Sequence, residues 1–570
     1  MKTKYYITTV FWVFILWIAS SSGILQGLMS ISGIWEGTFM HQFKIQIIFS
    51  DSGSGITAGM IHMYDGVTRI QDDKITEIEI NEGDRLTFYI PDKETRFEGR
   101  IKGISDEILG EFIFPDGSRH PLQMYRKGNE SSVTQVSDVD NKILLEREYR
   151  PEQLKEDVFF LRENLSSTHP QYNLYTSNEG FEAEYESLIN YLDRDLTIRE
   201  FYILIAPVVA KVGCSHTGIK VPEEYQNLQK RFGHYFPLRL YFEEHRVWVV
   251  SNDQLMNQIP LGSEVISIDH ISVENIIEGL LSFIPSEGFN ITTKYHELNK
   301  RYFEYYNFIN DAETIQIEYT KPGNQVVSST IIRAVPYKTI AETNGDAGNT
   351  TSVEYSMDQN TGIAILTIRS FAIRDISRFI EVMDSVFLEI KKLGITNLIL
   401  DVRGNQGGHP IFAAILFSYL VQHDFTYFSN ETRIPEFEPL YNPMSPNENS
   451  FSGNCYVLVD GGCLSTTGHL ISLLRYHKRA VFLGEEPGSW FYCNDNSKRI
   501  SLPNTLMDVN IPQTTFQTHV TGYNIGDPFE VDYPIPTSVN DLIENKDTYT
   551  EYTMSLINKS AENDGNRGSQ

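Results

Sequence analysis

Ser465 is the residue of this sequence best placed to act as a nucleophile. It ends the segment Gly461-Gly-Cys-Leu-Ser465, which follows the apolar run Cys455 to Asp460. This pattern predicts a strand, a glycine turn and a helix that starts at Thr466. A helix N-terminus offers amide donors and a favourable dipole to developing negative charge. The position equally suits an ordinary N-cap serine, and the segment lacks the Gly-x-Ser-x-Gly elbow of α/β-hydrolases.

A glycine-rich turn supplies a second candidate element of such a site. The apolar run Asn397 to Val402 leads into Asp401-x-Arg-Gly-Asn-x-Gly-Gly408, and the apolar stretch Pro410 to Val421 follows. The order predicts a buried strand, a tight turn and a helix. Because such a turn leaves backbone amides free, we expect this corner to bind an oxyanion.

His216 is the candidate general base, since histidine titrates near neutral pH. It lies in Val212-Gly-Cys-Ser215-His216-Thr-Gly218, which closes a predicted helix. A histidine in that setting also serves as a helix cap or dipole partner. The sequence alone leaves both roles open.

Together the three segments resemble the carboxy-terminal-processing (tail-specific) serine peptidase family, in particular the secreted bacterial type of its tricorn-like branch. The resemblance covers about Tyr149 to Tyr552. Asp401 to Gly408 matches the family's Asp-x-Arg-Gly-Asn-x-Gly-Gly, and Ser465 stands where the family has its nucleophile. The family's lysine base is missing, because Gly484-Glu-Glu-Pro-Gly-Ser-Trp490 places a tryptophan near its position.

The tricorn-like branch uses a Ser-His pair and a distant acid, so the resemblance implies a site of Ser465, His216 and Ser215. For the acid it implies Glu530, with Asp527 as the alternative, although both also read as exposed turn acids. Ser465 Oγ would attack a peptide carbonyl while His216 takes its proton. The amides of Gly407 and Thr466 are the expected oxyanion donors.

This resemblance implies a peptide or protein substrate and no cofactor or metal. Two other functions stay open: an inactive relative that binds peptides or lipids, and an esterase that uses the same residues. A hydrogen bond between Ser465 and His216 would separate the enzymes from the binding protein.

The fold class we expect is multidomain, α/β plus all-β. Short alternating runs between Gly, Asp and Asn turns predict a β module that resembles lipocalin-like modules. A polar linker, a helical segment, a PDZ-like domain and an α/β core follow, and the resemblance makes that core crotonase/ClpP-like. The bounds are a β module at 33–127, a linker at 128–148, helices at 149–220, a PDZ-like domain at 234–335, a core at 352–552 and a disordered tail at 561–570.

Within the core, alternating apolar runs predict four strands and three helices. The strands are Ala364 to Arg369, Leu398 to Val402, Cys455 to Asp460 and Ala480 to Gly484. The helices are Ile376 to Leu393, Pro410 to Val421 and Thr466 to Tyr476.

The net charge and the N-terminal segment indicate the partners and the localisation of the 570-residue chain. A formal charge of −28 argues against nucleic acid as a partner, since phosphate binding needs a basic surface. Two lysines, an apolar core and small residues predict a signal peptide at 1–22, and hence a periplasmic, cell-surface or secreted protein. A membrane partner is expected only if this segment stays uncleaved. The four cysteines have no CxxC spacing, so the sequence does not indicate a zinc site.

Overall fold

The computed structural model describes residues 31–39, 43–51, 56–65, 68–81, 85–102, 107–127, 144–251, 259–343, 352–429 and 433–567. The chain divides into two compact units: 1–149 with 196–198 and 223–232, and 150–195 with 199–222 and 233–570. The predicted signal peptide and residues 128–143 of the predicted linker lie outside the described residues. Across the described ranges, no helix has the length and apolar character needed to cross a membrane.

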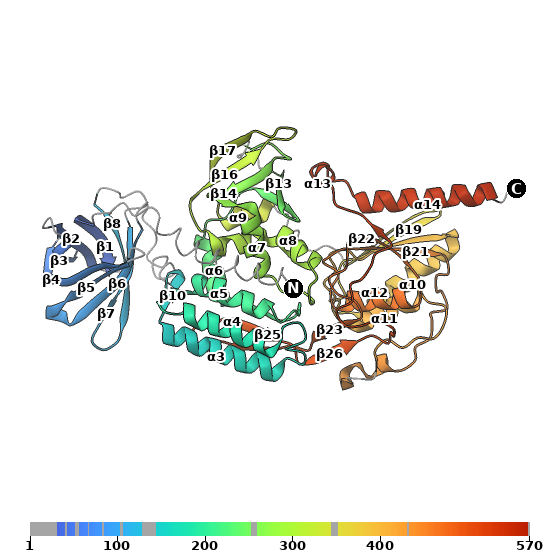
Figure 1. The fold of residues 1–570 in the computed structure, drawn as a ribbon, viewed down its shortest axis with the longest axis horizontal. Helices are drawn as coiled ribbons and strands as arrows, with labels where there is room; N and C mark the ends of the chain where they lie inside the picture. The colour runs from blue at the N-terminus through green and yellow to red at the C-terminus, as the bar shows by residue number, and fades with distance from the viewer. Residues whose placement is uncertain are drawn as a thin grey trace. The chain divides into compact units, whose positions relative to one another are not determined.

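A closed antiparallel barrel dominates the first unit and is drawn in blue in Figure 1. Its strands are β1 (Gly33–Phe39), β2 (Phe43–Asp51), β3 (Ile56–Asp65), β4 (Thr68–Asn81), β5 (Arg85–Ile90), β6 (Thr95–Lys102), β7 (Glu107–Ile113) and β8 (Arg119–Arg126). Alternate residues such as Ile45, Ile47 and Phe49 are buried, as a strand with one face on a core requires. Trp35 is fully buried and its Nε1 donates to the Ile31 carbonyl at 2.9 Å. The all-β prediction is confirmed, and the likeness to lipocalins stays a prediction.

Three smaller elements also belong to the first unit. Strands β9 (Glu148–Tyr149) and β10 (Leu196–Thr197) pair antiparallel, and α6 (Glu223–Phe232) is a helix. Glu148, in the predicted linker, accepts hydrogen bonds from Arg100 of β6. The end of the predicted linker is therefore a strand that is held to the barrel.

Helices and an antiparallel sheet form the first part of the second unit. The helices are α3 (Pro151–Thr168), α4 (Asn178–Tyr191) and α5 (Ile198–Ala210). The sheet has the order β12 (Arg239–Glu243), β13 (Arg246–Ser251), β14 (Glu264–Ile268), β16 (Thr314–Thr320), β17 (Val327–Arg333), and β15 (Ile271–Ser272) pairs with β14. Helices α7 (Val273–Ser282), α8 (Thr292–Ile309) and α9 (Tyr337–Thr343) accompany it. The long α8 was not predicted, and PDZ-like identity stays a prediction.

A six-stranded, mainly parallel sheet is the centre of the second unit. Its order is β18 (Val353–Asp358), β19 (Ile363–Ile368), β20 (Asn397–Asp401), β21 (Asn454–Val459), β22 (Val481–Gly484), β27 (Tyr533–Pro534), with only β18 antiparallel. Helices α10 (Ile376–Leu393), α11 (Pro410–Ser418) and α12 (Thr466–Tyr476) pack with one face, and α14 (Thr548–Arg567) with the other. Figure 1 shows these layers. The α/β prediction is confirmed.

Short elements extend this centre. They are β11 (Gly218–Lys220), β25 (Asp508–Ile511) and β24 (Lys498–Ser501) in one sheet, β23 (Tyr492–Asp495) with β26 (Thr514–Gln517), the 3-10 helix η3 (Pro435–Tyr441), and α13 (Val539–Glu544). Two predicted bounds were wrong. Helix α11 ends at Ser418 rather than Val421, and α14 continues through 561–567, where a disordered tail was predicted.

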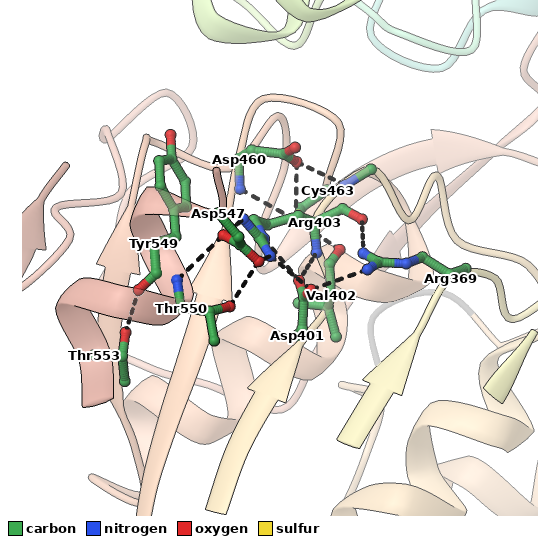
Figure 2. A network of polar contacts seen from close by, with 11 residues as sticks. Arg369, Asp401, Val402, Arg403, Asp460, Cys463, Asp547, Tyr549, Thr550 and Thr553 are labelled. Carbon is green, nitrogen blue, oxygen red and sulfur yellow. Dashed lines mark hydrogen bonds and ion pairs between the residues drawn. The ribbon is translucent and has the colours of Figure 1, made fainter. Parts of the chain in front are cut away.

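Arg403 ties the glycine turn after β20 to the C-terminal helix α14, as Figure 2 shows. Its guanidinium donates to Asp401 at 2.8 and 2.9 Å and to both carboxylate oxygens of Asp547 at 2.8 Å. Arg369 adds a bond of 3.1 Å to Asp401, whose side chain is 4% exposed. Burial opposes the charge of Asp547, but the bonds from Arg403 outweigh it and lower the pKa of that carboxyl. The Asp-x-Arg motif is thus a structural ion-pair network.

We expect Arg403→Ala to destabilise the second unit by about 3–5 kcal/mol, because it leaves the buried Asp401 short of a partner. The midpoint of urea unfolding, followed by circular dichroism, measures the loss. Arg378→Ala is the matched control, since its pair with Glu381 is 71% and 66% exposed and such pairs contribute about 0–1 kcal/mol. Equal stability of the two variants would contradict the structural role of Arg403.

Candidate active site

Ser465 occupies a strained turn between β21 and α12. Its φ of 53° and ψ of −123° lie in a region that non-glycine residues rarely adopt. Ser465 N donates to Ser489 Oγ at 2.7 Å, which fixes the turn. The Ser465 side chain makes no capping bond to the helix. The alternative of an ordinary N-cap serine is therefore wrong.

Gly407 packs directly against the Ser465 turn. A β-carbon at Gly407 would lie 2.9 Å from Ser465 Cβ and 3.0 Å from Thr466 N, so only glycine fits. The Gly407 amide donates to Asn405 Oδ1 at 2.9 Å. That amide is already satisfied, so the structure does not support the predicted role of Gly407 as an oxyanion donor.

Two other amides border the serine. The Gly407 carbonyl accepts from Phe371 N at 2.9 Å, so the N–H of Gly408, across the same trans peptide, points the opposite way. The Ser465 carbonyl likewise accepts from His469 N at 3.0 Å, which directs the Thr466 N–H away from the body of α12. Among the described residues, neither amide has a hydrogen-bond acceptor. The role of the Thr466 amide as an oxyanion donor stays a prediction.

His216 follows α5 in a loop, with its side chain 20% exposed. Ser215 Oγ lies 3.3 Å from His216 Nδ1 and donates to Glu287 Oε1 at 2.5 Å. Nδ1 itself lies 4.0 Å from Glu287 Oε1, while Nε2 lies 3.7 Å from Asp495 Oδ2. The ring therefore lies between Ser215 and two carboxylates, which is not the environment of a helix cap.

Glu287 is a buried carboxylate that the sequence did not single out. Its Oε1 also accepts from Ser215 N at 3.0 Å, whereas its buried Oε2 has no hydrogen-bond partner among the described residues. Burial raises the pKa of Glu287, and His216 and Ser215 act in the opposite direction. This carboxylate is the nearest acid to His216 Nδ1 by the contacts above.

The loop that carries Glu287 is fastened on both sides. Gly288 N donates to the Gly213 carbonyl at 2.9 Å, beside the His216 loop. On the other side, Thr293 Oγ1 donates to the Gly461 carbonyl at 3.0 Å, four residues before Ser465. Asn290 Nδ2 donates to the Pro487 carbonyl at 3.1 Å. The fold therefore fixes Glu287 relative to both the histidine loop and the serine turn.

Strand β23 connects the serine to the histidine. Asp495 reaches His216, and Cys493, two residues earlier, lies 3.4 Å from Nε2 of His469, one helical turn beyond Ser465. Burial, then Glu287, raises the pKa of the Cys493 thiol, while its hydrogen bond with the Ser465 side chain acts in the opposite direction. Burial and then the nearby His216 lower the pKa of His469 to about 3. These interactions gather the six side chains in one region.

No hydrogen bond within the described residues joins Ser465 to His216 directly. Catalytic hydrogen bonds are often long before substrate binds, so an enzyme without substrate can lack a direct Ser465–His216 bond.

The predicted acids Glu530 and Asp527 lie elsewhere. Glu530 is exposed, and its carbonyl accepts from Arg475 at 2.6 Å. Asp527 Oδ2 accepts from Asn524 N at 2.8 Å in a local turn. Among the described contacts, neither carboxylate reaches His216, so the structure does not support either as the acid. Both fit the alternative of turn residues.

Trp490 packs into an aromatic cluster. Its Nε1 donates to the Asp527 carbonyl at 3.1 Å, and its ring packs on Tyr523 and Phe529 with centroids 4.7 and 5.6 Å apart. Trp490 stands near the position of the lysine base in the carboxy-terminal-processing peptidases, and in this protein it packs against aromatic side chains.

Residues 362–507 match the sequence model of peptidase family S41. No curated protein matches the sequence significantly. Mature CPAF is similar in structure, with a TM-score of 0.52, 13% identity, and coverage of 73% of this chain and 98% of that chain. At that identity the likeness shows a shared fold.

Two further solved structures are similar to parts of the chain. The photosystem II D1 C-terminal processing protease has a TM-score of 0.36 and 13% identity, covering 68% of this chain and 96% of that chain. The tricorn protease has a TM-score of 0.33 and 13% identity, covering 92% of this chain and 46% of that chain. The match to peptidase family S41 covers the strands β19 to β22 and the Ser465 turn, and it supports a hydrolase.

Proposed function

We propose that the protein hydrolyses peptide bonds through an acyl-enzyme on Ser465, with His216 as the base and Glu287 as the acid. One observation carries this proposal: Ser215, His216 and Glu287 form a connected group beside the strained Ser465 turn. Strain at a nucleophile keeps its hydroxyl out of helix capping and turned toward the reacting atoms.

The acid acts through Ser215. In the neutral ring, Nδ1–H donates to Ser215 Oγ, and Ser215 O–H donates to Glu287 Oε1. This order fixes the tautomer that leaves a lone pair on Nε2, the nitrogen that must accept the Ser465 proton. When His216 becomes charged, Glu287 stabilises the imidazolium. The Ser465–His216 hydrogen bond forms when substrate binds, as part of the proposal.

The oxyanion is held by the amides of Thr466 and Gly408. Both N–H groups border Ser465, and Thr466 N begins α12, where the helix dipole favours negative charge. The proton from Ser465 passes to the leaving amine, and water then releases the acyl group. Export by the predicted signal peptide is a further part of the proposal, and it would bring the enzyme to extracytoplasmic proteins or peptides.

Ser465→Ala should abolish labelling by a fluorophosphonate probe and lower peptide hydrolysis by about 10⁴-fold or more, because it removes the attacking oxygen. Gel fluorescence and a quenched peptide substrate measure the two effects, and circular dichroism checks the fold. Ser501→Ala, at an exposed position of β24, is the control and should keep full labelling. Labelling that persists in Ser465→Ala would contradict the assignment of Ser465 as the nucleophile.

Glu287→Gln should lower kcat by about 10²-fold or more, since the histidine loses the group that orients and stabilises it. Glu530→Gln should leave kcat within about twofold, since surface substitutions away from special features change little. Both rates are measured on the same peptide at saturating substrate. The reverse result, a large loss in Glu530→Gln alone, would restore the acid that the sequence predicted.

A further inference from the structure

Cys214 adds a soft ligand beside the catalytic histidine. Its Sγ, one ring nitrogen of His216 and one carboxylate oxygen of Glu287 all lie within 4.8 Å of one another. In tetrahedral zinc sites with bonds of about 2.0–2.3 Å, the donor atoms lie about 3.5 Å apart, so a contraction of about 1 Å closes this group around an ion. Sulfur, imidazole and carboxylate are the donors that Zn²⁺ takes in proteins.

A second observation points to a ligand at this place. The side chain of Glu287 is 10% exposed, and its Oε2 is buried without a hydrogen-bond partner among the described residues. An unsatisfied buried carboxylate oxygen is costly, and a cation is one partner that would satisfy it. The side chains of His216 and Asp495, 20% and 43% exposed, open the group toward solvent.

We propose that Cys214, His216 and Glu287 form an inhibitory zinc site, with water completing the coordination. The inhibition, though not the binding, rests on the function proposed above. The sequence did not indicate a zinc site, because Glu287 lies far along the chain from the Cys-Ser-His segment. Folding alone brings the three ligands together.

Binding is a simple exchange of protons for metal. Burial, then Glu287, raises the pKa of the Cys214 thiol, so the thiol is protonated at neutral pH. Zn²⁺ displaces that proton to solvent and forms the Zn–S bond, without oxidation or reduction. Nδ1 of His216, the nitrogen that faces Glu287, gives its lone pair to the metal.

The ring then carries its remaining proton on Nε2, where Asp495 lies 3.7 Å away. A protonated Nε2 cannot accept the proton of Ser465, and Glu287 is occupied by the metal. Zinc therefore removes the base and the acid together, while the Ser465 turn stays unchanged. Excess chelator should restore the enzyme fully.

The experiment uses the metal-free full chain, buffered Zn²⁺ and a quenched peptide substrate. Wild type should lose activity reversibly, and Cys214→Ala should require at least about tenfold more Zn²⁺, since even outer-shell changes cost about 10–100-fold in metal affinity. Cys455→Ala is the matched control, a buried cysteine in β21 that should leave the inhibition unchanged. Equal inhibition of wild type and Cys214→Ala would overturn the site.

The absorption spectrum of bound Co²⁺ measures metal binding independently of enzyme activity. Wild type should show a thiolate-to-cobalt charge-transfer band that is absent in Cys214→Ala, and His216→Ala should weaken it although that variant is catalytically dead. No band in wild type would overturn the zinc site and leave the proposed function untouched. A band with undiminished peptidase activity would instead overturn the inhibition and show that His216 is not the base.

Discussion

The contact between Gly407 and the Ser465 turn is the constraint on which the rest of the site depends. A side chain at Gly407 would overlap Ser465 Cβ, so the two loops that follow β20 and β21 can approach only at a glycine. That approach brings the Gly408 and Thr466 amides to one place. Parallel pairing of β20 and β21 puts both loops at the same sheet edge, where α/β proteins commonly bind ligands.

The Asp-x-Arg-Gly-Asn motif stabilises the sheet edge after β20 and β21 and takes no direct part in the proposed reaction. Arg403 joins it to α14, and Asn405 holds both the Ile368 carbonyl and the Gly407 amide. A rigid glycine turn can keep its amides aimed without reorganising as charge develops, which is the main source of oxyanion stabilisation. Structural and catalytic duties are thus divided among neighbouring residues of one motif.

Short sequence patterns predicted the helices, strands and motifs that depend on interactions between residues close together in the chain. Apolar periodicity predicted the bounds of α10 and α12, and it placed the four core strands to within one residue. The segments Ser215-His216 and Ser465 were identified from short motifs. Glu287 was missed because it sits in a loop before α8, and nothing in its neighbours marks a buried carboxylate. That loop is placed by contacts far apart in the sequence, such as the bonds from Gly288 N to the Gly213 carbonyl and from Asn290 to the Pro487 carbonyl. Glu530 was chosen by likeness to a motif, and its exposure could not be read from the residues.

A crystal structure of the fluorophosphonate adduct tests the central claim most directly. The account predicts phosphorus on Ser465 Oγ, its oxygen within hydrogen-bond distance of Thr466 N and Gly408 N, and His216 Nε2 facing the adduct. It also predicts that Nδ1 keeps its contact with Ser215 and Glu287. An adduct whose oxygen touches neither amide, or a His216 ring that faces Glu530 instead of Glu287, would contradict it.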